Sequence, residues 1–183
     1  MELIASDIEG LYTVVLKKLE DDRGLFARTF CKNEFKKVGF DKEFVQFNHS
    51  FNKIKGTIRG MHFQKMPFAE TKLIRCVQGA VYDVAVDIRK DSKTYLQWFG
   101  IELSAENMVS VLIPEGFAHG FQTLTDDAAL IYHHTAFYTP QADAGIRFDD
   151  PAININWKLT AVNISDKDKC YPFIDHNFKG ITI

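Results

Sequence analysis

The stretch KLIRCVQGAVYDVAVDI, residues 72–88, indicates the fold class of this chain. It is rich in β-branched and other apolar residues, and Gly79 divides it into two segments, 72–78 and 80–88, that predict strands. In the first segment polar residues fall on both faces, so neither face is cleanly polar or apolar. Strands at a solvated surface alternate sharply, so this pattern is typical of a barrel whose interior holds a ligand site.

Similar segments recur on both sides of this stretch, with turn signals between them. They predict further strands at residues 11–19, 25–30, 43–50, 56–64, 97–103, 108–113, 116–124 and 128–135. The best helix candidate is residues 33–39, with Asn33 as its cap and Gly39 as its end. Many short strands with frequent turns predict an all-β sandwich or barrel with short peripheral helices. The sequence shows no repeat or linker, so we expect one domain, 1–183, with the irregular tail beyond Tyr138 packed over the barrel.

Composition argues against several classes of protein. The chain has 183 residues and a net charge of −2, so no overall basic field favours a nucleic-acid partner. No apolar run approaches the ~18 residues needed to cross a bilayer, and residues 1–10 lack the basic start and apolar core of a signal peptide. Cys31, Cys76 and Cys170 are an odd number without CxxC spacing, which indicates free thiols rather than a disulfide or zinc site. We therefore expect a cytoplasmic protein with no membrane or nucleic-acid partner.

The segment RGMHFQ, residues 59–64, carries the first candidates for chemistry. Arg59 is suited to bind phosphate, His62 can act as a base, and Lys72 in the neighbouring strand can meet a developing negative charge. Strict alternation along a strand places Arg59 and His62 on opposite faces. If both serve one site, the strand must bulge or twist between them, and Gly60 is the natural position for this.

The histidines raise the question of a metal site. The segment PEGFAH, residues 114–119, resembles the second motif of metal-binding cupins, Pro-x-Gly-x-x-His. The first motif of those proteins, His-x-His followed by Glu, is absent, because Gln64 stands two positions after His62 and Glu70 comes late. Two histidines at this spacing make a poor ligand set, so we expect no metal. His119 alone is as well explained as a hydrogen-bonded core residue.

Longer motifs extend the comparison along the chain. They are DDRGLF at 21–26, VQFNHS at 45–50, RGMHFQ at 59–64, LSAEN at 103–107, IPEGFAHGF at 113–121, YHHTAFYTP at 132–140, GIRFDDP at 145–151 and ISDKD at 164–168. In their order and spacing they resemble the dTDP-4-dehydrorhamnose 3,5-epimerase family. The resemblance implies a metal-free cupin-type jelly-roll barrel that needs no cofactor and forms a homodimer. It also implies inversion of one or both centres beside the ketone of a nucleotide-diphospho-4-keto-6-deoxy sugar or a related heptose, in the synthesis of surface glycans such as lipopolysaccharide or capsule.

The same resemblance assigns catalytic roles. It makes His62 the base that removes a proton beside the ketone, with Asp168 as the carboxylate that orients it. Lys72 would stabilise the enolate oxygen, with His119 nearby as a further donor, and Tyr132 would return a proton on the opposite face. From the residues alone, Asp168 in the charged segment DKDK reads as a solvated turn and Tyr132 as a core aromatic.

Substrate-binding roles follow in the same way. The residues implied around the phosphates, sugar and base are Arg59, Gln46, Asn48, Lys167, Phe26, Tyr138 and Asp143. Phe26 and Tyr138 would enclose the base, although Phe26 also fits ordinary packing in a chain with 16 Phe residues. Arg23 and Phe26 would reach the site of the neighbouring subunit, which makes the expected homodimer functional. Asp143 stands where Glu is usual and has a shorter reach.

Arg28 is the main departure from the family pattern. The usual string is Arg-Gly-x-Phe-x-Glu, and Arg28 stands here in place of the Glu. A carboxylate accepts a hydrogen bond from the ring N–H of thymine or uracil, whereas Arg can only donate. One hypothesis is therefore a base other than thymine, with a CDP-linked sugar as an example. The alternative is that Arg28 points away from the nucleotide and changes nothing.

Several alternatives share the expected fold. An epimerase that acts at carbon 3 or carbon 5 alone is the first, and a ketoisomerase that moves the carbonyl is the second. A non-catalytic nucleotide-sugar-binding cupin would bind the ligand without proton exchange. A metal cupin would lose activity with a chelator.

Overall fold

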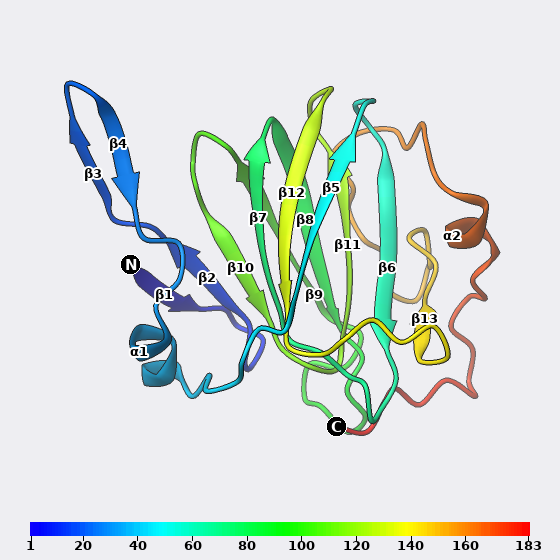
Figure 1. The fold of residues 1–183 in the computed structure, drawn as a ribbon. Helices are drawn as coiled ribbons and strands as arrows, with labels where there is room; N and C mark the ends of the chain where they lie inside the picture. The colour runs from blue at the N-terminus through cyan, green and yellow to red at the C-terminus, as the bar shows by residue number, and fades with distance from the viewer.

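The computed structural model describes residues 1–183 and consists of two opposed sheets with a few short helices (Figure 1). The strands are β1 (Glu2–Ala5), β2 (Tyr12–Val15), β3 (Lys18–Asp21), β4 (Gly24–Ala27), β5 (Gln46–Asn52), β6 (Ile58–Gln64), β7 (Lys72–Gln78), β8 (Ala80–Asp87), β9 (Trp98–Ser104), β10 (Ser110–Ile113), β11 (Phe117–Thr123), β12 (Ala128–His134) and β13 (Asp143–Gly145). One sheet has the order β1-β2-β10-β7-β12-β5 and the other β13-β6-β11-β8-β9. The all-β expectation is confirmed.

The main core lies between the two sheets. Ile74 and Leu130 from the six-stranded sheet form one buried cluster with Ala85 and Phe121 from the five-stranded sheet. Burial of these apolar side chains is the main force that holds the layers together. The polar site described below occupies the part of the same interior where β5, β6 and β12 approach one another.

Both outer faces are covered as well. Phe35 and Leu112 join Leu73 of β7 in a second cluster beneath the N-terminal segment. On the other sheet, Ile146 and Ile153 from the irregular tail pack against the strands, as the sequence predicts. The first half of β7, Lys72 to Ile74, is therefore buried on both faces, which explains why its sequence does not alternate cleanly there.

The strand predictions between residues 43 and 135 are confirmed in number, and β7 matches its expected range. The expected strand at 11–19 is wrong as a single element, because β2 and β3 are separate and pair with different partners. Strands β1 and β13 were not expected. Strands this short carry little periodic signal, so tertiary pairing decides them.

The helix prediction is confirmed in place and corrected in detail. The α-helix α1 (Lys32–Phe35) has Cys31, not Asn33, at its N-cap and continues into the 3₁₀ helix η1 (Lys36–Val38). Gly39 ends this segment with φ 84°, as expected for a glycine in the left-handed region. No helix in the structure is long and apolar enough to cross a membrane.

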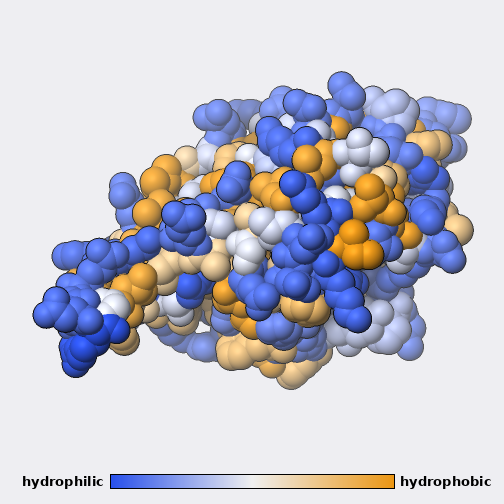
Figure 2. All heavy atoms as spheres, turned by 90° about the horizontal axis from the view of Figure 1, so that it is seen from above, coloured by the Kyte–Doolittle hydropathy of each residue, from blue (hydrophilic) through white to orange (hydrophobic).

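The hairpin of β3 and β4 projects from the body of the molecule (Figures 1 and 2). It forms its own two-stranded sheet. The projecting part carries both hydrophilic and hydrophobic residues, and Leu19, Leu25 and Phe26 are among its exposed apolar side chains. A two-stranded hairpin on its own is only marginally stable in water. The apolar side chains that this hairpin exposes are therefore unusual for an element that contacts so little of its own chain.

Candidate active site

A bulge in β6 brings Arg59 and His62 to one pocket. Arg59 pairs with Phe121 and His62 with His119 on β11, so β6 has one more residue than its partner between these pairs. The extra residue reverses the alternation of side chains, and both Arg59 and His62 line the same cavity. The bulge predicted at Gly60 is confirmed.

Glycine is required at this bulge. Gly60 has φ 117°, and a Cβ there would lie 2.6 Å from Cα of Gly120. A side chain at position 60 would therefore meet both backbone strain and a clash with backbone that cannot move aside. The close approach of the two glycines lets β6 bend inward.

The cavity has a volume of about 320 Å³ and is lined mainly by polar side chains. The lining residues are Asn48, Ser50, Arg59, His62, Phe63, Gln64, Glu70, Lys72, His119, Phe121, Tyr132, His134, Tyr138, Asp143 and Lys167. Most of the catalytic and substrate-binding residues expected from the sequence are in this set. Asp168 and Gln46 lie directly behind it and bond to residues that line it.

Asp168 orients His62 from behind the pocket. Its Oδ1 lies 2.6 Å from Nε2 of His62, and its Oδ2 accepts a hydrogen bond from the backbone N–H of Gly60 at 3.2 Å. Burial would raise the pKa of Asp168, but these two bonds outweigh it and the net pKa is lowered. The ionised carboxylate can only accept, so Nε2 of His62 carries the proton and Nδ1 has a free lone pair.

A short helix places this carboxylate. Helix α2 (Asp166–Cys170) begins at Ser165, whose hydroxyl accepts a hydrogen bond from the backbone N–H of Asp168. The helix turns Asp168 inward, where it is only 2 % exposed, while its neighbours in the charged segment stay at the surface. The solvated turn that the residues alone predict is therefore wrong for Asp168.

Lys72 and Tyr132 face the pocket from the opposite sheet. The Lys72 Nζ lies 3.3 Å from a Glu70 oxygen and 3.5 Å from the backbone oxygen of His62. An ammonium has three donors, so one is left for a ligand. Burial raises the pKa of Tyr132, which keeps its phenol protonated at neutral pH.

His119 is held by a buried carboxylate. Its Nε2 lies 2.9 Å from Oδ2 of Asp83, and both side chains are almost fully buried. Burial lowers the pKa of His119 despite the opposing effect of Asp83, so the ring is neutral. With its proton on Nε2, the ring offers only an acceptor at Nδ1. Donation from His119 to a substrate oxygen, as the sequence suggested, would require a protonated ring.

A polar rim is formed by Asn48, Tyr138, Asp143 and Lys167, with Gln46 behind it. Asn48 accepts a hydrogen bond from Gln46, and Gln46 in turn accepts one from the backbone N–H of Tyr138. Asp143 accepts a hydrogen bond from the Tyr138 hydroxyl and contacts the ammonium of Lys167. That ion pair raises the pKa of Lys167. The rim therefore presents both cationic and amide groups to a ligand.

Three expected binding residues lie outside this pocket. Arg23 pairs with Asp21 in the projecting hairpin and its side chain is 90 % exposed, while Phe26 is 69 % exposed. Arg28 lies just after β4 and pairs with Glu34 at 3.5 Å. The pocket of this chain is thus built without them.

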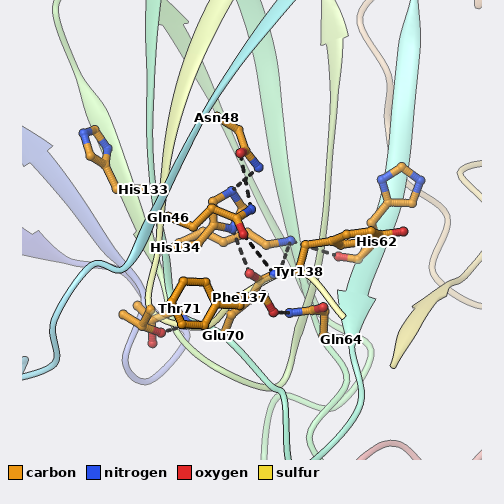
Figure 3. Close-up of polar contacts among 12 residues, drawn as sticks. Gln46, Asn48, His62, Gln64, Glu70, Thr71, His133, His134, Phe137 and Tyr138 are labelled. Atoms are coloured by element: carbon orange, nitrogen blue, oxygen red, sulfur yellow. Dashed lines mark hydrogen bonds and ion pairs between the residues drawn. The ribbon is translucent and has the colours of Figure 1, made fainter. Parts of the chain in front are cut away.

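Sequence reasoning missed the residues that support Lys72. Glu70 and His134 both line the pocket, and Figure 3 shows them with Asn48 and Gln46 in one group, across from His62. Their spacing in the sequence could have identified them, because His134 lies two residues after Tyr132 and Glu70 lies two residues before Lys72. Residues two apart share a face of extended backbone. No three His, Cys, Asp or Glu side chains converge as a metal-binding group.

Comparison with known proteins places this geometry in a family. Residues 5–176 match the family model described as dTDP-4-dehydrorhamnose 3,5-epimerase. A protein of that name from Shigella flexneri is 46 % identical over 92 % of this chain and 93 % of its own. The enzyme of that name from Bacillus anthracis, solved with TDP and pyrophosphate bound, has a TM-score of 0.92 and 41 % identity over 94 % of this chain and 99 % of its own.

A further solved relative carries a sugar ligand. It is the dTDP-6-deoxy-D-glucose-3,5-epimerase of Legionella pneumophila in complex with dTDP-4-keto-L-rhamnose, with a TM-score of 0.92 and 36 % identity over 100 % of this chain and 98 % of its own. These neighbours confirm the cupin-type fold expected from the sequence. The family model covers most of the chain, and the relatives match it over nearly their whole length. The chain therefore belongs to the dTDP-4-dehydrorhamnose 3,5-epimerase family.

Proposed function

We propose that the protein inverts carbon 3 and carbon 5 of a nucleotide-diphospho-4-keto-6-deoxy sugar by removal and return of a proton beside the ketone. One observation carries the proposal: the His62–Asp168 pair lies on one side of a polar pocket, with Lys72 and Tyr132 on the other. His62 comes from the five-stranded sheet and the other two from the six-stranded sheet. A base and an acid on opposing walls can act on opposite faces of a sugar ring.

His62 removes the proton. The lone pair of Nδ1 accepts the proton. Asp168 stabilises the imidazolium that results through its hydrogen bond with Nε2–H. As the C–H bond breaks, its electron pair moves towards the ketone and an enolate oxygen forms. The free N–H of Lys72 stabilises this oxygen, because a charged donor that is largely buried interacts more strongly with a developing anion.

Tyr132 returns a proton to the opposite face of the same carbon. Its raised pKa keeps the phenol a donor at neutral pH, and the phenolate formed is reprotonated from solvent or another pocket group. Repetition at the second carbon on the other side of the ketone gives the double inversion. An enzyme that acts at one carbon alone uses the same residues, and the site of deuterium exchange distinguishes the two cases.

The nucleotide binds at the rim. Arg59 can present its two terminal nitrogens to the diphosphate, because its Nε is already bonded to Asn52 at 2.6 Å, which fixes the direction of the guanidinium. Lys167, Gln46, Asn48 and Tyr138 complete this side of the pocket. Relatives of this chain bind TDP and dTDP-4-keto-L-rhamnose, which supports dTDP as the carrier.

The pairing of Arg28 with Glu34 favours the reading in which Arg28 points away from the nucleotide of its own chain. Titration with dTDP, CDP, GDP and UDP tests the carrier. Tighter binding of dTDP supports the proposal, and tighter binding of CDP restores the hypothesis based on Arg28.

The proposal includes a homodimer. The projecting hairpin exposes Arg23 and Phe26 far from the pocket of its own chain, so a second subunit gives them a site to complete. Mixed dimers of Phe26→Ala and His62→Ala subunits test this directly. Each mixed dimer has one site with an intact His62 and an intact Phe26 from its neighbour, so mixing should restore activity. No gain in activity on mixing would remove the shared site.

We place the reaction in deoxysugar synthesis for surface glycans such as lipopolysaccharide or capsule, in the cytoplasm. The three cysteines are all free thiols, which supports a reducing compartment. Fractionation of cells with a specific antibody, together with analysis of glycan composition after deletion, tests both statements. Loss of a deoxysugar from the surface glycan is the expected result, and an unchanged composition would contradict it.

The first experiment follows deuterium exchange by NMR. The enzyme is incubated in deuterated water with dTDP-4-keto-6-deoxyglucose, and loss of the carbon 3 and carbon 5 protons is recorded. Exchange at both positions supports the proposal, and exchange at one gives a single-centre enzyme. Binding without any exchange would indicate a non-catalytic nucleotide-sugar-binding protein, and movement of the carbonyl would indicate a ketoisomerase.

A further inference from the structure

Glu70 is a buried carboxylate shared between two neighbours. Its side chain is 9 % exposed, with one oxygen 3.3 Å from Nζ of Lys72 and the other 2.7 Å from Nδ1 of His134. Burial would raise the pKa of Glu70, but the His134 hydrogen bond and the charge of Lys72 outweigh it and lower the pKa. Glu70 is therefore ionised at neutral pH and accepts from both partners.

The hydrogen bonds beyond His134 have a fixed direction. The backbone N–H of Tyr138 can only donate, so the atom of Gln46 that it contacts at 3.0 Å is the amide oxygen. The NH₂ group of Gln46 then donates to the oxygen of Asn48 at 3.3 Å. This leaves the NH₂ group of Asn48 facing Nε2 of His134 at 3.2 Å, so Nε2 must be an acceptor.

The two ends of this chain of hydrogen bonds agree. The carboxylate of Glu70 requires a proton on Nδ1 of His134, and the amide of Asn48 requires none on Nε2. A single neutral tautomer satisfies both. A second proton on His134 would force Asn48 and then Gln46 to reverse their amides, and the fixed N–H of Tyr138 would be left facing an NH₂ group. Figure 3 shows these side chains in one continuous group.

We propose that Glu70 is a positioning residue that holds the Lys72 ammonium towards the substrate oxygen, and that His134, with its proton on Nδ1, extends this hold to Asn48 and Gln46 on the nucleotide side. The inference deepens the proposed function and rests on it for the roles of Lys72 and Asn48. It joins the catalytic cation and the binding amides in one hydrogen-bonded unit, in which Glu70 contacts Lys72 and His134 contacts Asn48. Replacement of Glu70 should therefore act mainly on kcat, and replacement of His134 mainly on nucleotide affinity.

Replacement of Glu70 acts on the Lys72 side. Glu70→Gln keeps the shape but is neutral and has one acceptor oxygen for two donors. With that oxygen on Nδ1 of His134, Lys72 loses its counter-ion while the bond to His134 is kept. We expect kcat to fall about tenfold or more, because a displaced ammonium no longer meets the enolate oxygen. The Kd for dTDP should stay within about threefold of the wild-type value, because nucleotide contacts are preserved. Glu43→Gln is the matched control, since Glu43 is an exposed carboxylate paired with Lys32.

Replacement of His134 acts on the nucleotide side. His134→Phe removes the acceptor that holds the amide of Asn48, so the Kd for dTDP should rise about threefold to tenfold, the worth of one hydrogen bond. His133→Phe is the matched control on the same strand. His133 points away from the pocket and its Nδ1 contacts the backbone oxygen of Leu73 (Figure 3). The two variants separate a role in this network from a general effect of losing a ring nitrogen on β12.

The deciding measurement needs no variant. Long-range proton–nitrogen NMR of the wild-type protein at neutral pH reports which nitrogen of His134 carries its proton. A proton on Nδ1 alone supports the network, and a proton on Nε2, or on both nitrogens, overturns it. Wild-type kcat in Glu70→Gln would also overturn the role of Glu70. If the wild-type enzyme catalyses no deuterium exchange, the proposed function fails, while the tautomer and the dTDP affinities still test the network itself.

Discussion

His62 Nε2 and Asp168 Oδ1 lie 2.6 Å apart although the two residues are 106 positions apart in the chain. The contact joins a bulged strand in the barrel to a short helix in the irregular tail. It fixes the tautomer of His62 and leaves the lone pair of Nδ1 free for the proposed role as base.

Asp168→Asn should lower kcat by about a hundredfold or more, because the amide no longer fixes the tautomer of His62 or stabilises its protonated form. Deuterium exchange at the substrate carbons gives the rate. Affinity for dTDP should stay near the wild-type value, since Asp168 lies behind the pocket. An unchanged kcat in a folded variant would show that His62 acts without its partner.

Asp168 should also contribute to acid sensitivity. Its folded-state pKa is lowered below the value of about 3.9 found in unfolded chains, so it stabilises the fold above that pH and loses this contribution as pH falls through the folded-state pKa. The free energy of unfolding of the wild type should therefore fall towards that of Asp168→Asn between pH 5 and pH 3. Urea titrations across this range measure the difference, and a constant gap would contradict the lowered pKa.

Tyr132→Phe should slow return of the proton more than its removal. The variant keeps the ring but lacks the phenolic donor, and loss of a general acid costs about 10²–10⁴-fold in rate. Inversion followed by NMR should fall by that amount, while exchange of the substrate proton with deuterium continues through His62. Equal loss of exchange and inversion would place Tyr132 in proton removal as well.

Gly60→Ala should destabilise the protein and disrupt the pocket. Position 60 combines φ 117° with a Cβ clash of 2.6 Å against Gly120. Gly24→Ala is a matched control, because Gly24 has φ 125° with no atom within 4 Å of its Cβ position. Strain alone costs about 1–3 kcal/mol, so the free energy of unfolding should fall by that amount in Gly24→Ala and by clearly more in Gly60→Ala. An equal decrease in the free energy of unfolding in both variants would show that the close approach to Gly120 does not affect stability.

Much of the fold was predictable because its signals are local. The strands on either side of Gly79 follow from apolar runs divided by a turn residue, and the bulge at Gly60 follows from the period of two along a strand. Helix α2 was missed because its charged segment reads as a solvated turn, and only packing of the tail against β6 buries Asp168.

The sequence by itself determined the all-β class and most of the strands that line the pocket. Its resemblance to a family named His62, Lys72 and Tyr132 as the candidates for chemistry. The tertiary structure decided which side chains support them. Glu70 and His134 are 64 residues apart, and their partnership depends on how β12 pairs with β7 and β5. Periodicity places a residue on a face of its own strand, whereas the hydrogen-bond direction of a buried polar network depends on every partner that folding brings within reach.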